Sequence, residues 1–438
     1  MPLQSRRARR HGREAEGGCL VAGYTEPAVI LRGGNTLPRN FRVPVGPGGG
    51  TSAALWAGMS IGFASLLSFV GTLIAVELVR RAAGRHGFVD RDHGRGGGPA
   101  YRALPRVGGV GIAIGLAAGL ALLAPQSDLI AVIALAAAAL FGVGFLDDVR
   151  PVPAWLKLVV LALCAAGCVA YGLRPSTWPL VGGDMPASAS WILALGWLIA
   201  VPCAINFVDG LDGLAAGVTG VAACALAITA AAVGSPVGIA LSGVTGAAAA
   251  GFWLHNRYPA RIFMGDGGAF LLGFMLGCAS LVVIVDAPGA TLSVAAALVL
   301  PFADLACAVI RRIRRRDPFG ADANHLHHQL QRRMGHADAV RAALTVSTLG
   351  ALLGLSLAPT TGPRYVVLIA LACASAALLV RRAGGAAVAM AAATVFALSV
   401  RPAGDALAND PASLARLEPP ASIVPLGDGS PVSESELP

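Results

Sequence analysis

The sequence predicts an all-α, polytopic helical membrane protein with about 11 transmembrane helices. Two observations support this prediction. First, 55% of the 438 residues are hydrophobic and only 13% are charged, with a mean hydropathy of +0.69, whereas soluble globular domains carry about 25% charged residues. Second, the hydrophobic residues fall into runs close to the roughly 20 residues that an α-helix needs to cross a bilayer. We therefore expect the lipid bilayer to be a principal partner of the chain.

Eleven apolar runs are predicted to span the membrane. In chain order they are Trp56–Leu78, Val107–Leu123, Leu129–Phe145, Pro153–Leu173, Trp191–Val208, Leu214–Val233, Val237–Leu254, Ala269–Val285, Thr291–Ile310, Ala342–Ala358 and Tyr365–Val380. A polar loop from Arg311 to His336 separates the ninth run from the tenth. A further Ala-rich segment, Ala386–Val400, is a marginal candidate because alanine alone contributes little to insertion. The sequence thus predicts eleven or twelve spans.

The spans define one transmembrane domain at residues 54–400, flanked by two tails. Residues 1–53 are rich in Arg and then in Gly and Pro, without an apolar run long enough to span a membrane or to serve as a signal sequence. Residues 401–438 are rich in Pro and Ser and are acidic. Both tails are expected to be disordered. An alternative hypothesis is that translation starts nearer Met59, which N-terminal sequencing of the mature protein would test.

The basic residues divide unevenly between the two sides of this predicted topology. If the loop that contains Arg80–Arg106 is cytoplasmic, alternate loops place most other Arg and Lys residues on the same side. The opposite side carries little beyond Arg174, Arg364 and Arg401. This asymmetry follows the positive-inside rule. The net charge of +9 therefore reflects membrane topology, and we expect no nucleic acid as a partner.

The segment Asn206–Gly217, NFVDGLDGLAAG, lies at the end of the fifth apolar run. Asp209 and Asp212 each precede a glycine, and Asp-Gly pairs are turn signals, so a tight connection between helices is one interpretation. The two carboxylates and the Asn206 amide together also form an oxygen-rich group of the kind that holds a hard cation or a nucleotide. The spacing excludes an EF-hand loop, which needs acids at alternate positions before its glycine.

Acidic and basic residues also mark three neighbouring span ends. Asp147 and Asp148 end the third run in GFLDDVR, where two adjacent carboxylates oppose the helix dipole, which favours a functional role. Lys157, in PAWLKL, either extends to the membrane interface or has a functional role. Asp266 lies in FMGDGGAFLLG, where the N–H groups of a helix start could receive a phosphate while Asp266 holds its metal. This string is not a Walker loop, because no Lys-Ser/Thr follows.

Three histidines form the string HLHH in the polar loop, at His325, His327 and His328. A zinc site is one interpretation, although the spacing does not match HExxH. Beside the arginines at 311–316, the histidines fit better as donors to phosphate oxygens. The arginines themselves are more often topological anchors than catalytic groups.

All of these polar groups fall on the predicted cytoplasmic side. A transporter would be expected to keep buried acids near the middle of the bilayer, along a path open to both sides. A one-sided rim of acids instead favours an enzyme that acts at the inner surface on one water-soluble and one membrane-embedded substrate. We therefore expect the active-site loops to be cytoplasmic.

Taken together, the strings resemble the polyprenyl-phosphate N-acetylhexosamine-1-phosphate transferases, in the bacterial undecaprenyl-phosphate GlcNAc-1-phosphate transferase branch. The resemblance covers about residues 88–330 and is carried by FVDR, PRVGG, GFLDDVR with Lys157, NFVDGLDGLAAG, PARIFMGDGGAFLLG and PFGADANHLHHQL. It implies a multi-pass protein of the bacterial inner (plasma) membrane with a cytoplasmic active site.

The resemblance also implies roles for individual residues. Asp147 and Asp148 are expected to be catalytic, at the reaction centre, and Asn206 and Asp266 are expected to bind Mg²⁺. The expected substrate-binding residues are Lys157, Asp209, Asp212, Arg312, His325, His327 and His328. In the implied reaction, the phosphate of undecaprenyl phosphate attacks the β-phosphorus of a UDP-sugar such as UDP-GlcNAc. UMP leaves, and the product is a lipid diphosphate sugar for cell-envelope polysaccharide synthesis.

The mechanism is expected to be direct attack. The second pKa of a phosphate monoester is about 6, so the lipid phosphate is mostly ionised at neutral pH and needs no obligatory general base. Mg²⁺ would offset the repulsion between this nucleophile and the diphosphate. A covalent aspartyl-phosphate route through Asp147 is the alternative.

The chain departs from the family pattern at two places. Arg95 is followed by three glycines where the family usually has Arg-Lys-x-His, and Ala269 stands where serine is frequent. HLHHQL also differs from the three consecutive histidines and acid of the enzymes that use UDP-MurNAc-pentapeptide, which favours an N-acetylhexosamine donor. A UDP-MurNAc-pentapeptide phosphotransferase and a non-enzymatic transporter on the same scaffold stay open as alternatives, as does a homodimer.

Overall fold

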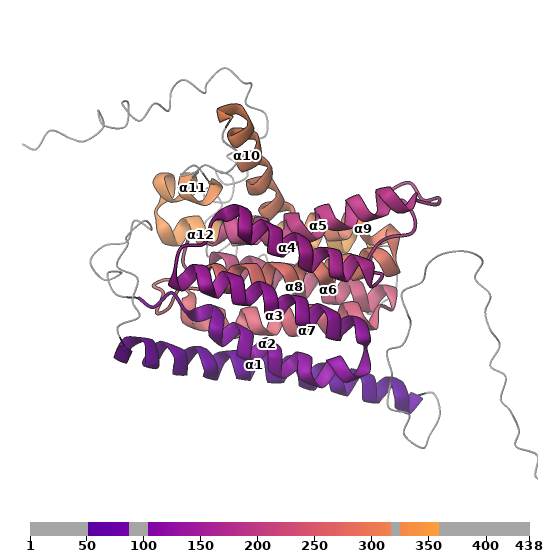
Figure 1. Ribbon diagram of the computed structural model, residues 1–438, viewed down its shortest axis with the longest axis horizontal. Helices are drawn as coiled ribbons and strands as arrows, with labels where there is room; N and C mark the ends of the chain where they lie inside the picture. The colour runs from indigo at the N-terminus through magenta and orange to yellow at the C-terminus, as the bar shows by residue number, and fades with distance from the viewer. Residues whose placement is uncertain (1–50, 87–103, 317–324, 359–438) are drawn as a thin grey trace, which may run out of the picture. The chain divides into compact units, whose positions relative to one another are not determined.

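A computed structural model describes residues 51–86, 104–316 and 325–358 of the chain (Figure 1). These residues are mostly α-helical and include no β-strand, although Thr177 and Asp184 form an isolated bridge. The helices are α1 (Thr51–His86), α2 (Gly108–Leu123), α3 (Asp128–Val149), α4 (Ala154–Ala170), α5 (Ala187–Val208), α6 (Leu214–Val233), α7 (Pro236–Asn256), α8 (Gly265–Asp286), α9 (Thr291–Ala297), α10 (Val299–Arg315), α11 (Leu326–Met334) and α12 (His336–Ser356). The all-α fold class is confirmed for this part of the chain.

Seven of the described helices are long and apolar enough to cross a membrane, namely α1, α3, α5, α6, α7, α8 and α12. Two shorter apolar helices, α2 and α4, accompany them, and a bent pair that includes α9 and α10 would make an eighth candidate span. The chain is therefore a multi-pass membrane protein. Each of the first ten predicted spans coincides with one of these elements, but the count of about 11 is not confirmed. The predicted eleventh and twelfth spans, and nearly all of both predicted tails, lie outside the described residues.

The ninth predicted span is not one straight helix. The chain bends by 75° between the segment that ends at Ala297 and α10. Pro301 explains the bend, because it has no N–H to donate to the carbonyl of Ala297 four residues earlier. After the bend, α10 projects away from the neighbouring helices (Figure 1). The span predicted at Thr291–Ile310 thus corresponds to a bent pair of helices, which counts as a candidate span only if the pair is taken together.

The predicted polar loop from Arg311 to His336 is also largely helical. Arg311 is part of α10, which continues to Arg315, and the histidine string begins α11. Only residues 317–324 of this stretch lie outside the described residues. Helix α10 continues through this stretch because apolar residues such as Val309 and Ile313 recur four residues apart, which is helical spacing, with arginines at positions between and after them. The arginines are therefore fixed along a helix instead of being distributed over a loop.

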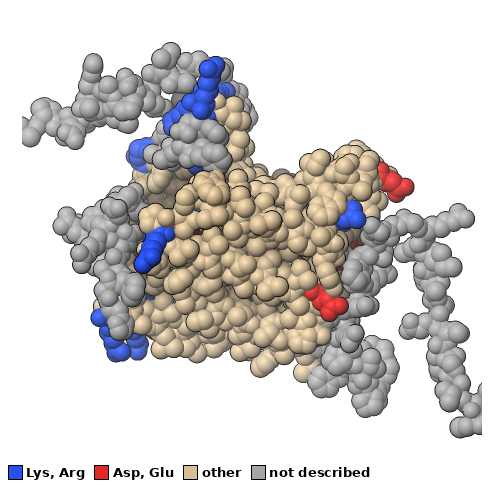
Figure 2. Space-filling model, in the orientation of Figure 1, with Lys and Arg blue, Asp and Glu red and all other residues tan. Residues whose placement is uncertain are grey.

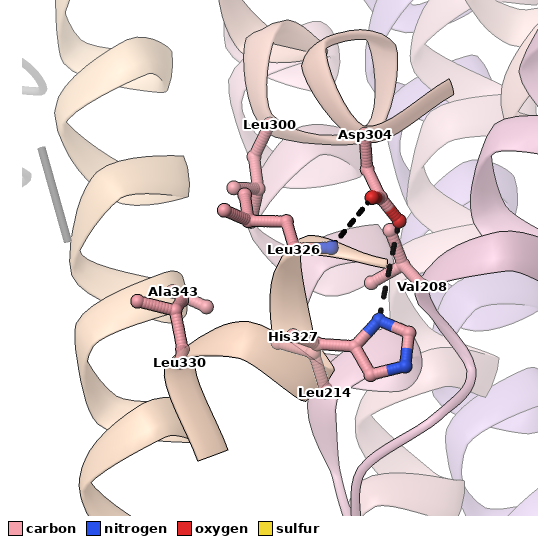
Figure 3. Close-up of a pocket in the computed structure, with 8 residues that line it drawn as sticks. All are labelled: Val208, Leu214, Leu300, Asp304, Leu326, His327, Leu330 and Ala343. Atoms are coloured by element: carbon pink, nitrogen blue, oxygen red, sulfur yellow. Dashed lines mark hydrogen bonds and ion pairs between the residues drawn. The ribbon is translucent and has the colours of Figure 1, made fainter. Parts of the chain in front are cut away.

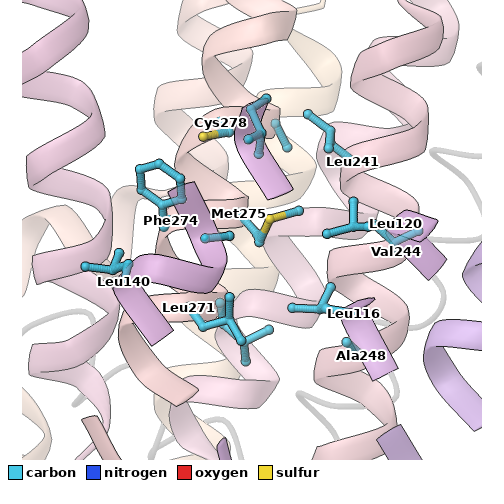
Figure 4. Close-up of a cluster of buried hydrophobic side chains, with 14 of the residues drawn as sticks. Leu116, Leu120, Leu140, Leu241, Val244, Ala248, Leu271, Phe274, Met275 and Cys278 are labelled. Carbon is cyan, nitrogen blue, oxygen red and sulfur yellow. The ribbon is translucent and has the colours of Figure 1, made fainter. Parts of the chain in front are cut away.

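Helix α8 lies at the centre of the packing. Within its most apolar window, 94% of the residues are buried, as expected for a helix that is apolar on all sides. Figure 4 shows Phe274, Met275 and Cys278 of α8 surrounded by side chains of other helices, including Leu140 and Leu241. This core holds the start of α8, and thus Asp266, against its neighbours.

Consecutive membrane helices run in opposite directions, so alternate helix ends meet on one side. The ends of α3, α5 and α7 and the starts of α4, α6 and α8 share this side. Figure 2 shows Lys and Arg side chains along one edge, from α10 down to the end of α1, beside a flank that is almost without charge. The polar strings of the sequence are brought together at the same side.

Candidate active site

Two acids from separate helices meet at one lysine. The ammonium nitrogen of Lys157, on the first turn of α4, donates to Asp147 Oδ2 at 2.9 Å and to Asp266 Oδ2 at 2.7 Å. All three side chains are only 16–17% exposed. Lys157 therefore points inward and does not extend to the membrane interface, which was one of the two interpretations of its position. The structure unites GFLDDVR, PAWLKL and MGDGGA in a single cluster, which we call the acid centre.

Asp148 plays a different part in the acid centre from its neighbour Asp147. Its two oxygens accept the backbone N–H groups of Asp266, at 2.7 Å, and Gly267, at 3.0 Å. A carboxylate is a favourable partner for the start of a helix, where N–H groups lack partners in the helix itself. These two N–H groups are thus bonded to Asp148 and are not available to a phosphate in this structure.

Glycines allow α3 and α8 to approach closely enough for these contacts. A β-carbon on Gly144 would lie 2.6 Å from the α-carbon of Gly267, a distance that real side chains essentially never show. Gly265 has a φ of 76°, in the left-handed region that favours glycine, and turns the chain into α8. The glycines of FGVGFLDD and MGDGGA therefore serve helix packing, and this packing brings the carboxyl groups of Asp148 and Asp266 together.

Arg106 is a further member of the acid centre that the sequence analysis treated only as a topological anchor. Its guanidinium lies 3.3 Å from Asp266 and 3.7 Å from Asp148. The backbone of the PRVGG string is held in place because Gly108 N–H and Gly109 N–H donate to the carbonyls of Phe263 and Met264. With an exposed fraction of 42%, the Arg106 side chain is also open to solvent, so a ligand phosphate could reach it.

The two acids of NFVDGLDGLAAG occupy different environments. Asp212 is 2% exposed, and its carboxylate accepts the backbone N–H of Ala260 at 3.0 Å. Asp209 ends α5 and is half-buried. Asn256, at the end of α7, joins the same region by accepting from Gly213 N–H and donating to the carbonyl of Ile262. Asp212 thus connects the turn between α5 and α6 to the segment before α8.

Asn206 lies on the last turn of α5 and is half-buried. Helix α5 packs antiparallel to α8, and Gly273 of α8 lies against Pro202 and Ile205 of α5. Because Asn206 follows Pro202 by about one turn, it is displaced toward the end of the bundle at which Asp266 lies. The two predicted metal ligands are therefore on adjoining helices near the same end.

The histidine string is held by a carboxylate that the sequence analysis did not single out. Asp304 of α10 accepts from His325 Nδ1 at 3.0 Å and from the backbone N–H of Leu326 at 2.8 Å. His327 Nδ1 lies 3.9 Å from the same carboxylate. Figure 3 shows Asp304 and His327 as the polar side chains of a small, otherwise apolar cavity.

Arg312 and His325 both contact the ring of Phe207. The guanidinium carbon of Arg312 is 4.8 Å from the ring centroid, and the His325 ring centroid is 5.0 Å from it. His328 packs against His327, with ring centroids 4.2 Å apart. Burial, followed by the neighbouring His325 and Arg332, lowers the pKa of His328 below its usual 6.5. The predicted substrate residues of the histidine string and α10 thus form a second group, adjoining the NFVDGLDG segment through Phe207.

The acid centre has the donor chemistry that Mg²⁺ prefers, because it brings carboxylate oxygens close together. The Lys157 ammonium already bridges Asp147 and Asp266, which shows that one cation can contact both carboxylates. Among the described residues, however, no three His, Cys, Asp or Glu side chains are arranged as a metal site. Asn206 and Asp266 as Mg²⁺ ligands stay a prediction.

Two features in the sequence could have revealed the missed residues. Asp304 lies inside the ninth apolar run, and an acid within a membrane span is by default a functional candidate. Arg106 belongs to PRVGG, one of the strings that carry the family resemblance, but it was counted only among the basic residues of its loop. His336, whose Nε2 accepts the backbone N–H of Asp212 at 3.1 Å, had no comparable signal.

Known proteins are similar to this chain over the segment that carries most of the site residues. Residues 130–284, which include Asp147, Lys157, Asn206 and Asp266, match glycosyl transferase family 4. The probable undecaprenyl-phosphate N-acetylglucosaminyl 1-phosphate transferase of Bacillus subtilis is 31% identical over 274 residues, covering 61% of this chain and 76% of that protein. The chain belongs to glycosyl transferase family 4, which confirms the membership predicted from its motifs.

Two further relatives illustrate the similarity. The decaprenyl-phosphate N-acetylglucosaminephosphotransferase of Mycobacterium tuberculosis is 32% identical over 270 residues, covering 53% of this chain and 66% of that protein. A phospho-N-acetylmuramoyl-pentapeptide-transferase of Moorella thermoacetica is 31% identical over 194 residues, covering 41% of this chain and 61% of that protein. The similarity to the relatives named for N-acetylglucosamine extends over more of the chain.

Proposed function

We propose that the protein transfers N-acetylglucosamine-1-phosphate from UDP-N-acetylglucosamine to a polyprenyl phosphate at the cytoplasmic face of a bacterial inner membrane. The products are UMP and a polyprenyl diphosphate sugar. The observation that carries the proposal is the acid centre, in which Lys157 joins Asp147 to Asp266. The longer matches to relatives named for N-acetylglucosamine transfer support the donor sugar.

The acid centre suits a reaction between two negatively charged substrates. Lys157 and Arg106 bring positive charge to the side of the bundle where a membrane-embedded lipid phosphate would meet the donor. Such preorganised charge stabilises a transition state in which negative charge builds up on phosphoryl oxygens. When bound, Mg²⁺ would supply Lewis-acid stabilisation of the diphosphate, with Asn206 and Asp266 as its proposed ligands.

Each acid has a distinct proposed part. Asp147 accepts both from Lys157 and from the backbone N–H of Val152 at 2.7 Å, so its orientation is fixed. It is placed to orient the lipid phosphate or to accept its proton. Asp148 is 2% exposed and bonded to the start of α8, and we assign it the positioning of Asp266. Direct attack by the lipid phosphate needs no covalent enzyme intermediate.

The histidine group is proposed to close over the donor. His325, His327 and Arg312 converge beside Phe207 and the NFVDGLDG segment. Imidazole and guanidinium groups donate to phosphate oxygens, and charge-assisted hydrogen bonds of this kind are about twice as strong as neutral ones. In this arrangement the diphosphate lies between the histidine group and the acid centre, with UMP as the leaving group.

The test is UMP release by the purified protein in lipid vesicles containing polyprenyl phosphate. Separate reactions contain UDP-GlcNAc, UDP-MurNAc-pentapeptide and other UDP-sugars, each with and without Mg²⁺. Release with UDP-GlcNAc that requires the lipid, requires Mg²⁺ and is lost in Asp147→Asn supports the proposal. Release only with UDP-MurNAc-pentapeptide would show that this compound, and not UDP-GlcNAc, is the donor. Absence of release with every donor, together with solute flux in the same vesicles, would favour a transporter.

The same preparation separates the two chemical routes. If attack is direct, labelled UMP exchanges into UDP-GlcNAc only when the lipid product is present. Exchange by the enzyme in the absence of lipid, or a trapped acyl phosphate on Asp147, would establish the covalent route instead.

A further inference from the structure

Asp304 has an environment that is unusual for a carboxylate inside a membrane protein. It lies one turn after the bend at the start of α10, and it is 1% exposed. Burial of an acid is costly unless hydrogen bonds compensate for the lost water. Both of its oxygens are bonded, one to His325 Nδ1 and the other to Leu326 N–H. A buried group bonded in this way is held in one orientation.

The bond to Leu326 caps a helix from outside. Leu326 is the first residue of α11, and its N–H is one of those that have no partner within the helix. His325 precedes α11 but provides no side-chain cap of its own. Asp304 therefore supplies from α10 the carboxylate that usually comes from a residue at the start of the helix itself. It fixes the beginning of α11 relative to α10.

The bond to His325 fixes the imidazole. A carboxylate accepts only, so Nδ1 of His325 must donate, and the proton is assigned to Nδ1 by this partner. The other ring nitrogen, Nε2, is then the atom left to face a ligand. If the imidazole donates from Nε2 to a phosphate, it carries a positive charge, and the carboxylate behind the ring balances that charge. This arrangement suits a residue that meets a diphosphate.

Asp304 also fixes the positions of the His325 and His327 rings against α5 and the turn that follows it. The rings of His325 and His327 stack at 5.6 Å with an angle of 10° between their planes. His325 contacts Phe207 of α5, and His327 lies against Gly210 in the following turn. One carboxylate thus connects α10, α11 and the NFVDGLDG segment.

We propose that Asp304 is the positioning residue of the HLHH string, which sets the tautomer of His325 and anchors the start of α11. The inference rests on the proposed function, because it assigns His325 to the donor diphosphate. Asp304 itself acts through His325 and does not touch the substrate.

The variant Asp304→Asn tests the two hydrogen bonds of Asp304 separately, because it is expected to keep the bond to Leu326 N–H and to change the bond to His325. The carboxamide oxygen can still accept from Leu326 N–H, but the amide nitrogen then faces His325 Nδ1 and donates to it. The imidazole must respond by placing its proton on Nε2. Asp304→Ala removes both acceptors and serves as the variant in which α11 also loses its cap. Asp338→Asn is the matched control, because Asp338 is an exposed acid of α12 that pairs with Arg341 at 2.6 Å.

Two readouts test the positioning role. In protein labelled with ¹⁵N-histidine, the His325 signal, assigned by its absence in His325→Gln, reports Nδ1 protonation in the wild type and Nε2 protonation in Asp304→Asn. The turnover of Asp304→Asn falls by about 100-fold, because the neutral amide no longer balances a positive charge on His325 when the imidazole meets a phosphate, while its thermal midpoint and that of the control stay close to the wild type. In the His325→Gln background, Asp304→Asn has no further effect on turnover.

The outcomes distinguish this inference from the proposed function. An unchanged His325 tautomer in Asp304→Asn, or a loss of turnover that adds fully to that of His325→Gln, overturns the positioning role. If the wild type releases no UMP from any donor, the proposed function fails, but the NMR comparison still decides whether Asp304 sets the imidazole tautomer. A fall in thermal midpoint for Asp304→Asn as large as for Asp304→Ala would reduce Asp304 to a structural cap and also overturn the inference.

Discussion

The imidazole of His327 lies directly against Gly210, in the space that a β-carbon on residue 210 would occupy. Gly210 follows Asp209 in the turn between α5 and α6, whereas His327 belongs to α11, more than a hundred residues later. The absence of a side chain at residue 210 is therefore what allows the histidine string to close onto the NFVDGLDG segment. The two motifs form one surface.

Gly210→Ala is predicted to displace His327. We expect turnover to fall at least about tenfold, which corresponds to ~1.4 kcal/mol of transition-state stabilisation, since the whole α11 start must shift. Gly220→Ala is the control, because a β-carbon there would meet no other atom within 4 Å. UMP release measured on both variants checks the prediction, and equal turnover for the two would contradict the packing argument.

Lys157→Gln is predicted to affect metal binding and catalysis in opposite directions. The change removes the positive charge that pairs with Asp266, one of the two proposed metal ligands, so a divalent cation should bind more tightly. Turnover should nevertheless fall by about 100-fold, because a preorganised charge for the phosphoryl oxygens is lost.

Mn²⁺ binding, followed by electron paramagnetic resonance, and UMP release provide the two measurements for Lys157→Gln. Arg150→Gln is a suitable control, because Arg150 is an exposed cation close to the same helix end. Weaker Mn²⁺ binding in Lys157→Gln than in the control would show that the acid centre does not hold the metal.

The two acids of the NFVDGLDG segment are predicted to differ in what they support. Asp212→Ala leaves the N–H of Ala260 without its buried partner, which costs about 1–3 kcal/mol of stability. Asp209 is half-buried at the end of α5, so Asp209→Ala should lower the thermal midpoint less than Asp212→Ala and reduce the stabilisation that UDP-GlcNAc provides. Thermal unfolding with and without the nucleotide sugar checks both. A larger loss of midpoint in Asp209→Ala than in Asp212→Ala would reverse the assignment.

The sequence predicted the position of the acid centre well, and the reason is topological. Once the apolar runs alternate across a membrane, Asp147, Lys157 and Asp266 are assigned to one side without knowledge of their contacts. What topology does not give is which acid meets which base. Asp147 and Asp148 are adjacent in the chain, yet one bonds Lys157 and the other bonds the start of α8. That difference depends on the close approach of Gly144 to Gly267, which is a tertiary contact.

The histidine region was predicted less well. Pro301 was readable as a helix breaker, but the apolar run around it is long enough to suggest an uninterrupted span. The bend turns α10 outward and carries Asp304 to the start of α11. From the sequence alone, Asp304 has no evident partner, and the arginine-rich segment is predicted to be a loop. The pairing of Asp304 with His325 requires the bend, and periodicity alone does not report it.

His328 should contribute a pH dependence to stability. Burial, His325 and Arg332 lower its pKa below 6.5 in the folded protein, so the unfolded chain takes up a proton first as the pH falls. Stability therefore decreases as the pH drops below about 6.5, because the unfolded state then binds more protons than the folded state. Protonation opposes folding in this window, and the effect is absent at higher pH, where His328 is neutral in both states.

His328→Gln should remove this contribution, so its thermal midpoint should fall less than that of the wild type between pH 7.5 and pH 5.5 (about one unit on either side of the ordinary histidine pKa). Arg333→Gln, on the same helix, keeps His328 and does not titrate in this range, so its midpoint should fall as steeply as that of the wild type. If His328→Gln loses as much midpoint as Arg333→Gln, then the imidazole of His328 is not held in its neutral form by the packing of α11, and the low-pH loss of stability arises elsewhere in the chain.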